Sequence, residues 1–299
     1  GVAQELSSMI TVEDGYKEEI RGEFLLTAVS TQRARILDYI YIKLSKPSGI
    51  ELDHISEHLP EGMNMEEYQE LMDEFMLDSQ NKAKAVAFQK AGMPVSIKNN
   101  GVMVAEVLKN GAAVGKLQRG DLIIAVDGQK VSRDTEAQEL IQQREIGDPV
   151  TVTVDRDGEI LDFTMETVPL HINDEPRPSI GVSIYSNIEY SFPREIYFHM
   201  QNIGGPSAGG MFALEIYNQL VKEDITRGRR IAGTGTIDLD GKIGPIDGVE
   251  QKVIAAEREG AELFLVPVEN HEAALQAAGS IKVVAIESFD EALEYLMHN

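Results

Sequence analysis

The sequence predicts a mixed fold, part α+β and part α/β, and two features of its 299 residues support this prediction. Residues 179–299 alternate short apolar runs with amphipathic stretches, a pattern typical of strands joined by helices. Residues 93–168 are rich in strand-like runs and hold two hairpin signals, Asp127-Gly128 and Asp157-Gly158. Two different sequence patterns in a chain of this length indicate at least two domains.

The N-terminal part, residues 1–92, predicts two strands and one long helix. Strands are expected over 9–12 and 22–29, with Glu13-Asp14-Gly15 as a turn between them. Residues 64–90 are rich in Glu, Met, Leu and Ala, with apolar positions at helical spacing, and Gly92-Met93-Pro94 ends this helix. We expect these elements to pack onto the C-terminal domain, which would make the middle domain an insertion.

The middle and C-terminal parts are predicted to form two further domains joined by a linker at 169–178, which contains three prolines. In the middle domain, strands are expected over 101–107, 122–126, 149–156 and 159–165, with a helix capped by Asp134. In residues 179–299, strands are expected over 179–185, 195–200, 229–234, 237–239, 263–266 and 283–286, and helices over 207–221, 249–258 and 289–297.

Composition and charge exclude several kinds of partner. Fifty acidic and 27 basic residues give a net charge of −23, which argues against nucleic acid or an anionic membrane surface as the main partner. The chain has no cysteine, so disulfides and thiolate metal sites are impossible, and its six histidines lack metal-ligand spacing. We therefore expect no metal and no cofactor. No apolar run reaches the roughly 18 residues that a membrane span needs.

The glycine-rich run from Gly204 to Gly210 is the first candidate site, because it exposes Ser207 at the start of a predicted helix. The backbone N–H groups of Ser207 and Ala208, with the positive end of that helix, can stabilise an oxyanion. A structural alternative is a serine that only caps the helix. Gly205-Pro206-Ser207-Ala208-Gly209 also satisfies the Gly-x-Ser-x-Gly pattern of α/β-hydrolases, with His271 or His298 as a nominal partner.

Lys252 is the second candidate, 45 positions after Ser207 among small and apolar residues. A desolvated lysine loses its proton more easily and can act as general base to a serine. The alternative is a surface lysine paired with Glu250, Glu257 or Glu259. Ser207 and Lys252 together indicate peptide hydrolysis.

Several motifs resemble the Lon-type serine peptidase domain in order and spacing across residues 179–299. They are Gly205-Pro206-Ser207-Ala208-Gly209, Gly233-Thr234-Gly235, Gly244-Pro245-Ile246-Asp247-Gly248, Lys252 and Val266-Pro267-Val268-Glu269-Asn270. The resemblance implies that Ser207 is the nucleophile, Lys252 its base and Thr234 a residue that orients the lysine. Gly204 departs from the family, since cytosolic Lon proteases usually carry an acidic residue there.

The middle domain resembles a bacterial PDZ domain through Gly120-Asp121-Leu122-Ile123 and Asp127-Gly128. The resemblance implies peptide binding by strand addition, and Gly101-Val102-Met103-Val104 is the expected sheet edge. The alternative for this run is an ordinary core strand.

A PDZ domain followed by a Lon-type peptidase is similar to the membrane-anchored PDZ–Lon proteases of bacteria. The chain contains no Gly-x-x-x-x-Gly-Lys-Ser/Thr phosphate loop, so we expect proteolysis without ATP. The resemblance also implies protein or peptide substrates, an N-terminal membrane anchor ahead of Gly1 and a catalytic domain outside the cytoplasmic membrane. The competing interpretation is a peptide-binding adaptor with an inactive protease-like platform, and the sequence leaves homo-oligomer formation open.

Overall fold

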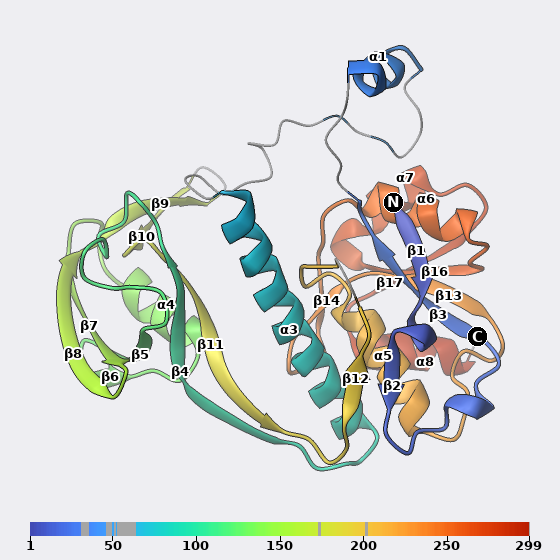
Figure 1. Cartoon of the computed structure of the whole chain (residues 1–299), viewed down its shortest axis with the longest axis horizontal. Helices are drawn as coiled ribbons and strands as arrows, with labels where there is room; N and C mark the ends of the chain where they lie inside the picture. The colour runs from blue at the N-terminus through green and yellow to red at the C-terminus, as the bar shows by residue number, and fades with distance from the viewer. Residues whose placement is uncertain are drawn as a thin grey trace. The chain divides into compact units, whose positions relative to one another are not determined.

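Two units divide the chain in the computed structural model (Figure 1). Unit 1 comprises Gly1–Val95 and Phe192–Asn299, and unit 2 comprises Ser96–Ser191. The structure describes residues 1–30, 36–45, 50, 52, 64–172, 175–200 and 203–298. Unit 2 is continuous in sequence and interrupts unit 1.

A five-stranded sheet forms the centre of unit 1, with the strand order β1-β3-β13-β16-β17. The strands are β1 (Val2–Glu5), β3 (Glu23–Ala28), β13 (Arg230–Gly233), β16 (Leu263–Pro267) and β17 (Lys282–Ile286). β1 runs antiparallel to β3, and the other neighbours are parallel. The N-terminal strand β3 therefore lies inside a sheet whose other parallel strands come from the end of the chain.

Alternate side chains of these strands enter two different cores, so helices cover both faces of the sheet. Phe24, Ile231 and Leu265 point into a core with α5 (Gly209–Leu220) and α8 (Phe289–His298). Leu25 and Phe264 point into the other core, with α6 (Val249–Arg258) and α7 (His271–Ala277). Apolar residues on both faces explain why these strands read as continuous hydrophobic runs.

The long N-terminal helix α3 (Met65–Lys90) packs against α5. Asn64 caps it: the Asn64 side chain accepts from the N–H groups of Glu66 and Glu67, and the Glu67 carboxylate accepts from the Asn64 N–H. This reciprocal capping box stabilises the first turn. Gly92, with φ of +74°, follows the last turn, so the predicted helix is confirmed at both ends.

The remaining N-terminal elements of unit 1 are the 3₁₀ turns η1 (Leu6–Ser8) and η2 (Lys17–Glu19), the strand β2 (Ile10–Val12) and the helix α1 (Ile36–Ser45). The two strands predicted around Glu13-Asp14-Gly15 form, but they do not pair as a hairpin. β2 pairs with β12 (Ile196–Phe198), whereas β3 pairs with β1 and β13. A short hairpin of β14 (Thr236–Ile237) and β15 (Ile243–Gly244), and the turn η3 (Val268–Asn270), complete the unit.

Unit 2 is a sheet in the order β11-β4-β5-β7-β8, with β6 paired to β5. Its elements are β4 (Ser96–Val107), β5 (Leu122–Val126), β6 (Gln129–Lys130), α4 (Asp134–Gln142), β7 (Pro149–Arg156), β8 (Glu159–Glu166) and β11 (Val182–Ser191). Both predicted hairpin turns form, with left-handed backbone at Asp127, Gly128, Asp157 and Gly158. The helix begins one residue earlier than expected, because Arg133 is its N-cap and Asp134 is its first residue.

The structure corrects the expected domain boundaries and the linker. Residues 168–172 and 175–179 are strands β9 and β10, which pair with each other, rather than a linker. A two-stranded ribbon tolerates proline because each strand has an edge where no N–H is required. Residues 182–191 form β11 and pair with β4 inside unit 2, so the predicted start of the C-terminal domain at residue 179 is wrong.

The expected sheet edge at Gly101-Val102-Met103-Val104 is also wrong. β4 is an interior strand, because Val102 and Met103 face Ser186 and Tyr185 of β11 on one side and residues of β5 on the other. A strand paired on both sides has no free backbone groups for an added peptide. The edge strands of this sheet are β11 and β8. Periodicity alone could not separate these cases, since an interior strand and an edge strand share the same alternation.

Candidate active site

The candidate site lies at the carboxyl ends of the parallel strands in unit 1. Thr234 directly follows β13, and Thr27 is near the end of β3. In open α/β sheets this end gathers functional side chains because the connecting loops converge there. The turn before α5 and the start of α6 bring Ser207 and Lys252 to the same place.

Ser207 lies half-buried in the turn that precedes α5. Gly205 is buried in the left-handed region, with φ of +85°, and its N–H donates to the carbonyl oxygen of Met72 on α3 at 2.9 Å. Glycine adopts this conformation without steric cost. Gly209 begins the helix, and a Cβ atom there would lie 2.6 Å from Ile237. The glycines thus allow the serine turn to be held tightly between α3 and β14.

Lys252 is only 3% exposed, one turn into α6. Burial lowers its pKa from the usual 10.5 to about 8, and the negative charge of Asp247 acts in the opposite direction. Its Nζ donates to Thr234 Oγ1 at 3.2 Å. The alternative of a surface lysine paired with glutamate is therefore wrong: Glu257, for example, accepts from the N–H groups of residues 279–281 instead.

Thr234 connects the lysine to the serine. The Thr234 side chain is buried, accepts from Lys252, and donates to the carbonyl oxygen of Ser207 at 3.0 Å. The Gly235 N–H donates to the same carbonyl at 2.8 Å. All three residues predicted from sequence therefore meet in one site. Within the described part of the chain, no hydrogen bond joins the Ser207 hydroxyl directly to Lys252.

The N–H groups of Ser207 and Ala208 have no hydrogen-bond partner among the described residues. Neighbouring N–H groups do have partners: that of Gly209 donates to Pro206 and that of Gly210 to Gly235. Two adjacent N–H groups at the start of a helix are therefore available to an acceptor outside these residues, as the first N–H groups of a helix commonly are.

Residues from three other segments hold the site and were not assigned roles from the sequence. The buried Thr27 hydroxyl donates to the Gly233 carbonyl at 2.8 Å, next to Thr234. The Asn270 amide binds both the N–H and the carbonyl of Ile246, at 2.9 and 2.8 Å, and so fixes the loop before α6. Ser79 on α3 donates to the Pro206 carbonyl at 3.2 Å.

Neither histidine of the esterase interpretation makes a hydrogen bond to Ser207 in the described structure. His271 begins α7 and His298 ends α8. The serine's polar neighbourhood instead consists of Thr234, Gly235 and, through Thr234, Lys252. In the described residues, Lys252 and not a histidine is therefore the ionisable side chain connected to Ser207, through Thr234 and the Ser207 carbonyl.

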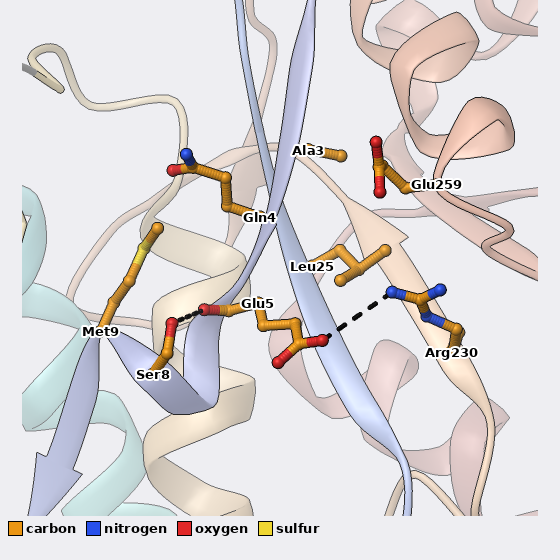
Figure 2. Close-up of a pocket in the computed structure, with 8 residues that line it drawn as sticks. All are labelled: Ala3, Gln4, Glu5, Ser8, Met9, Leu25, Arg230 and Glu259. Atoms are coloured by element: carbon orange, nitrogen blue, oxygen red, sulfur yellow. Dashed lines mark hydrogen bonds and ion pairs between the residues drawn. The ribbon is translucent and has the colours of Figure 1, made fainter.

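A separate pocket of about 360 Å³ lies at the opposite end of β13, and its residues are drawn in Figure 2. Glu5, Arg230 and Glu259 give it charge, and the nearest Glu5–Arg230 atoms are 3.9 Å apart. Burial and the adjacent Glu5 carboxyl raise the pKa of Glu23, which also pairs with Arg230. This pocket contains none of the three site residues.

Comparison with known families assigns both units. Residues 195–299 match the family model of the Lon protease C-terminal proteolytic domain, and residues 80–167 match that of the PDZ domain. The chain combines a PDZ domain with a Lon-type proteolytic domain. The predicted fold class is thereby confirmed. No ATPase domain is evident in these residues.

Lon proteases are also the relatives found among curated proteins. Lon protease 2 of Bacillus subtilis is 37% identical over 97 residues, which is 32% of this chain and 17% of that protein. The Lon protease of Syntrophomonas wolfei is 35% identical over 133 residues, 42% of this chain and 14% of the relative. The chain therefore spans less than a fifth of the length of these two relatives.

Among solved structures, PDZ domains from Listeria are similar to part of this chain. The PDZ domain of an SdrC-like protein from Listeria monocytogenes is 22% identical, with a TM-score of 0.28, and the match covers 30% of this chain and 92% of that one. No helix in the described part of the chain is both long and apolar enough to cross a bilayer.

Proposed function

We propose that the protein is an ATP-independent serine endopeptidase with a Ser207–Lys252 dyad. The observation that carries this proposal is the buried Lys252, whose pKa is lowered to about 8 and whose Nζ is linked to the Ser207 residue through Thr234. A lysine of this kind is neutral in a useful fraction of molecules near neutral pH, as a general base must be.

In the proposed reaction, neutral Lys252 removes the proton of the Ser207 hydroxyl as its oxygen attacks the scissile carbonyl. The tetrahedral oxyanion is stabilised by the N–H groups of Ser207 and Ala208, each contributing roughly 3–4 kcal/mol in comparable sites. Lys252 then returns the proton to the leaving amine, and water hydrolyses the acyl-enzyme by the same route. Thr234 keeps the lysine amine at the serine.

We further propose that the PDZ domain selects the protein or peptide substrates at the edge of β11. Within the described part of the chain, this strand pairs with β4 alone, and α4 contacts it. Ser186 of β11 and Asp134 of α4 are joined by two hydrogen bonds of 2.9 and 2.8 Å. An extended peptide adds to such a free edge through backbone hydrogen bonds, with neighbouring side chains giving specificity.

From the resemblance to the membrane-anchored PDZ–Lon proteases of bacteria, we also propose a location at the outer face of the cytoplasmic membrane, with an N-terminal anchor ahead of the present chain. Accessibility of the domain to an added protease in intact spheroplasts tests this proposal. Digestion only after lysis would contradict it.

The decisive experiment for the function is cleavage of an unfolded protein by the purified chain without nucleotide. We expect cleavage by the wild type and at least a hundredfold loss in both Ser207→Ala and Lys252→Met, since each lacks one member of the dyad. Circular dichroism should show both variants folded. Cleavage only with added ATP and a partner ATPase would contradict the proposal, and no cleavage at all would favour the adaptor interpretation.

A further inference from the structure

Helix α3 of the N-terminal segment holds the Ser207 turn at two peptide groups, Gly204–Gly205 and Pro206–Ser207. The Gly205 N–H donates to the Met72 carbonyl at 2.9 Å, and the Ser79 hydroxyl donates to the Pro206 carbonyl at 3.2 Å. Both contacts come from outside residues 195–299, the stretch that matches the Lon-type proteolytic domain.

The second contact determines how the Pro206–Ser207 peptide group is turned. A trans peptide group is planar, and its carbonyl and N–H point in opposite directions. When Ser79 fixes the Pro206 carbonyl toward α3, the Ser207 N–H must therefore point away from α3. That N–H has no partner among the described residues and is one of the two proposed oxyanion donors.

From this geometry we infer that Ser79 is a positioning residue for the oxyanion site, an inference that rests on the proposed peptidase function. Ser79 does not touch the substrate. It acts through the Pro206–Ser207 peptide group, and it holds the Ser207 N–H in the direction that the developing negative charge requires.

The local packing favours this role over an incidental contact. Ser79 is 3% exposed in the interior of α3, where a serine hydroxyl usually bonds to a carbonyl of its own helix. Here it reaches a carbonyl 127 positions away in sequence. A Cβ atom on Gly209 would lie 2.7 Å from Ser79 Oγ, so the absence of a side chain at Gly209 gives the hydroxyl its space.

Among the described residues, the Pro206 carbonyl has one other partner, the Gly209 N–H at 3.3 Å. Without the hydroxyl, that longer bond would be the remaining hydrogen bond to the Pro206 carbonyl among these residues. Loss of Ser79 should therefore loosen the orientation of the Ser207 N–H while leaving Lys252 and Thr234 in place.

The test compares Ser79→Ala with the wild type on a short peptide and on a peptide boronic acid of the same sequence. Ser207 adds to boron to give a tetrahedral anion, which uses the oxyanion donors, whereas a product peptide does not. We expect Ser79→Ala to lower kcat by about 10–100-fold and boronate affinity by a similar factor. KM, product affinity and the pH dependence of activity should be unchanged.

Two controls separate positioning from general destabilisation. Ser79→Thr keeps the hydroxyl donor and should restore most of the activity. Thr226→Val removes a different buried hydroxyl of unit 1, which bonds to Asp224, and should leave kcat and boronate affinity as in the wild type.

A Ser79→Ala enzyme with unchanged kcat, or one that loses kcat but keeps boronate affinity, would overturn the inference. So would Ser79→Thr with the full defect of Ser79→Ala. If the wild type itself shows no Ser207-dependent cleavage, the proposed function fails, and that outcome is distinct from a failure at Ser79.

Discussion

Lys252 differs from a surface lysine because its charged form has almost no contact with water. The residue is buried on α6, its amine donates to Thr234, and the charge of the exposed Asp247 opposes the lowering of its pKa. Desolvation destabilises the ammonium form, so the proton is released nearer to neutral pH.

Activity should consequently rise with pH along a limb with an apparent pKa of about 8, as kcat/KM plotted against pH will show. Below that pH the lysine is protonated and cannot act as base. Lys252→Arg should be inactive at every pH, because guanidinium keeps its proton. Near-normal turnover by Lys252→Arg would remove the lysine from the mechanism.

Asp247→Asn supplies a finer test of the same environment. The carboxylate of Asp247 favours the protonated lysine, so its removal should lower the pKa of Lys252 further and move the limb to lower pH. Glu250→Gln, at an exposed position on the same helix, serves as the control for a simple change of net charge. A limb that does not move, or moves equally in the control, contradicts this assignment.

The sequence predicted Ser207, Lys252 and Thr234 because each belongs to a short motif with defined spacing. It missed Thr27 and Ser79 because a single hydroxyl within an apolar strand or a helix has no local signature. Their roles depend on contacts across 206 and 127 positions, which only the fold creates.

At the scale of elements, α5 links the proposed nucleophile to the N-terminal strands. Gln219, near its end, accepts from the Val12 N–H and donates both to the Ile10 carbonyl and to the Glu215 carboxyl. Glu215 is 1% exposed, and burial raises its pKa to about 7. Lys17 opposes this rise and Asp224 adds to it. The strand β2 is thus held to α5 by a polar network with a titratable member.

The stability of the chain should therefore fall as pH rises through 7. Because the folded pKa of Glu215 lies above its unfolded value of 4.5, its contribution is complete below pH 4.5 and is lost above about 7. Glu215→Gln should remove this dependence and exceed the wild type in stability at pH 8.5 by up to about 3 kcal/mol. Urea unfolding at pH 5 and pH 8.5 measures both values, and a Glu215→Gln variant with the same pH slope as wild type would contradict the assignment.

Signals within a few residues predicted most helices and strands, but they could not predict which distant strands pair. Asp-Gly turns and the Asn64 cap act within a few residues, so both hairpins and α3 could be located. β1 was missed because Val2–Glu5 is short and carries two polar residues. Residues 169–178 were predicted to be a linker because proline is unusual in strands, and the pairing of β9 with β10 has no signal in the sequence.

For the molecule as a whole, the decisive feature is that unit 2 is inserted into a loop of unit 1. Ser96 and Ser191 are register partners in the pair β4–β11, so the two ends of the insertion are neighbours. Adjacent strands place such residues about 5 Å apart. The PDZ domain can therefore be removed at Ser96 and Ser191, whereas a deletion that ends at the sequence-predicted boundary, residue 168, would leave β11 without its partner β4.

A chain in which two glycines replace residues 96–191 should keep its kcat/KM on a short peptide within about threefold. Cleavage of an unfolded protein should fall at least tenfold, because selection at β11 is lost while the dyad is untouched. The same deletion combined with Ser207→Ala gives the background rate. An equal loss on peptide and protein would assign the PDZ domain a structural role in place of a selective one.

The interrupted order of unit 1 also has a consequence during synthesis on the ribosome. Thr27 of β3 and its partner Gly233 are 206 positions apart, a separation that takes roughly 10–40 s to translate. All strands of unit 2 are synthesised within that interval, ahead of Ser207 and Lys252. The PDZ domain, which is continuous in sequence, can therefore begin to fold while the parallel strands that complete the sheet around β3 are still being made.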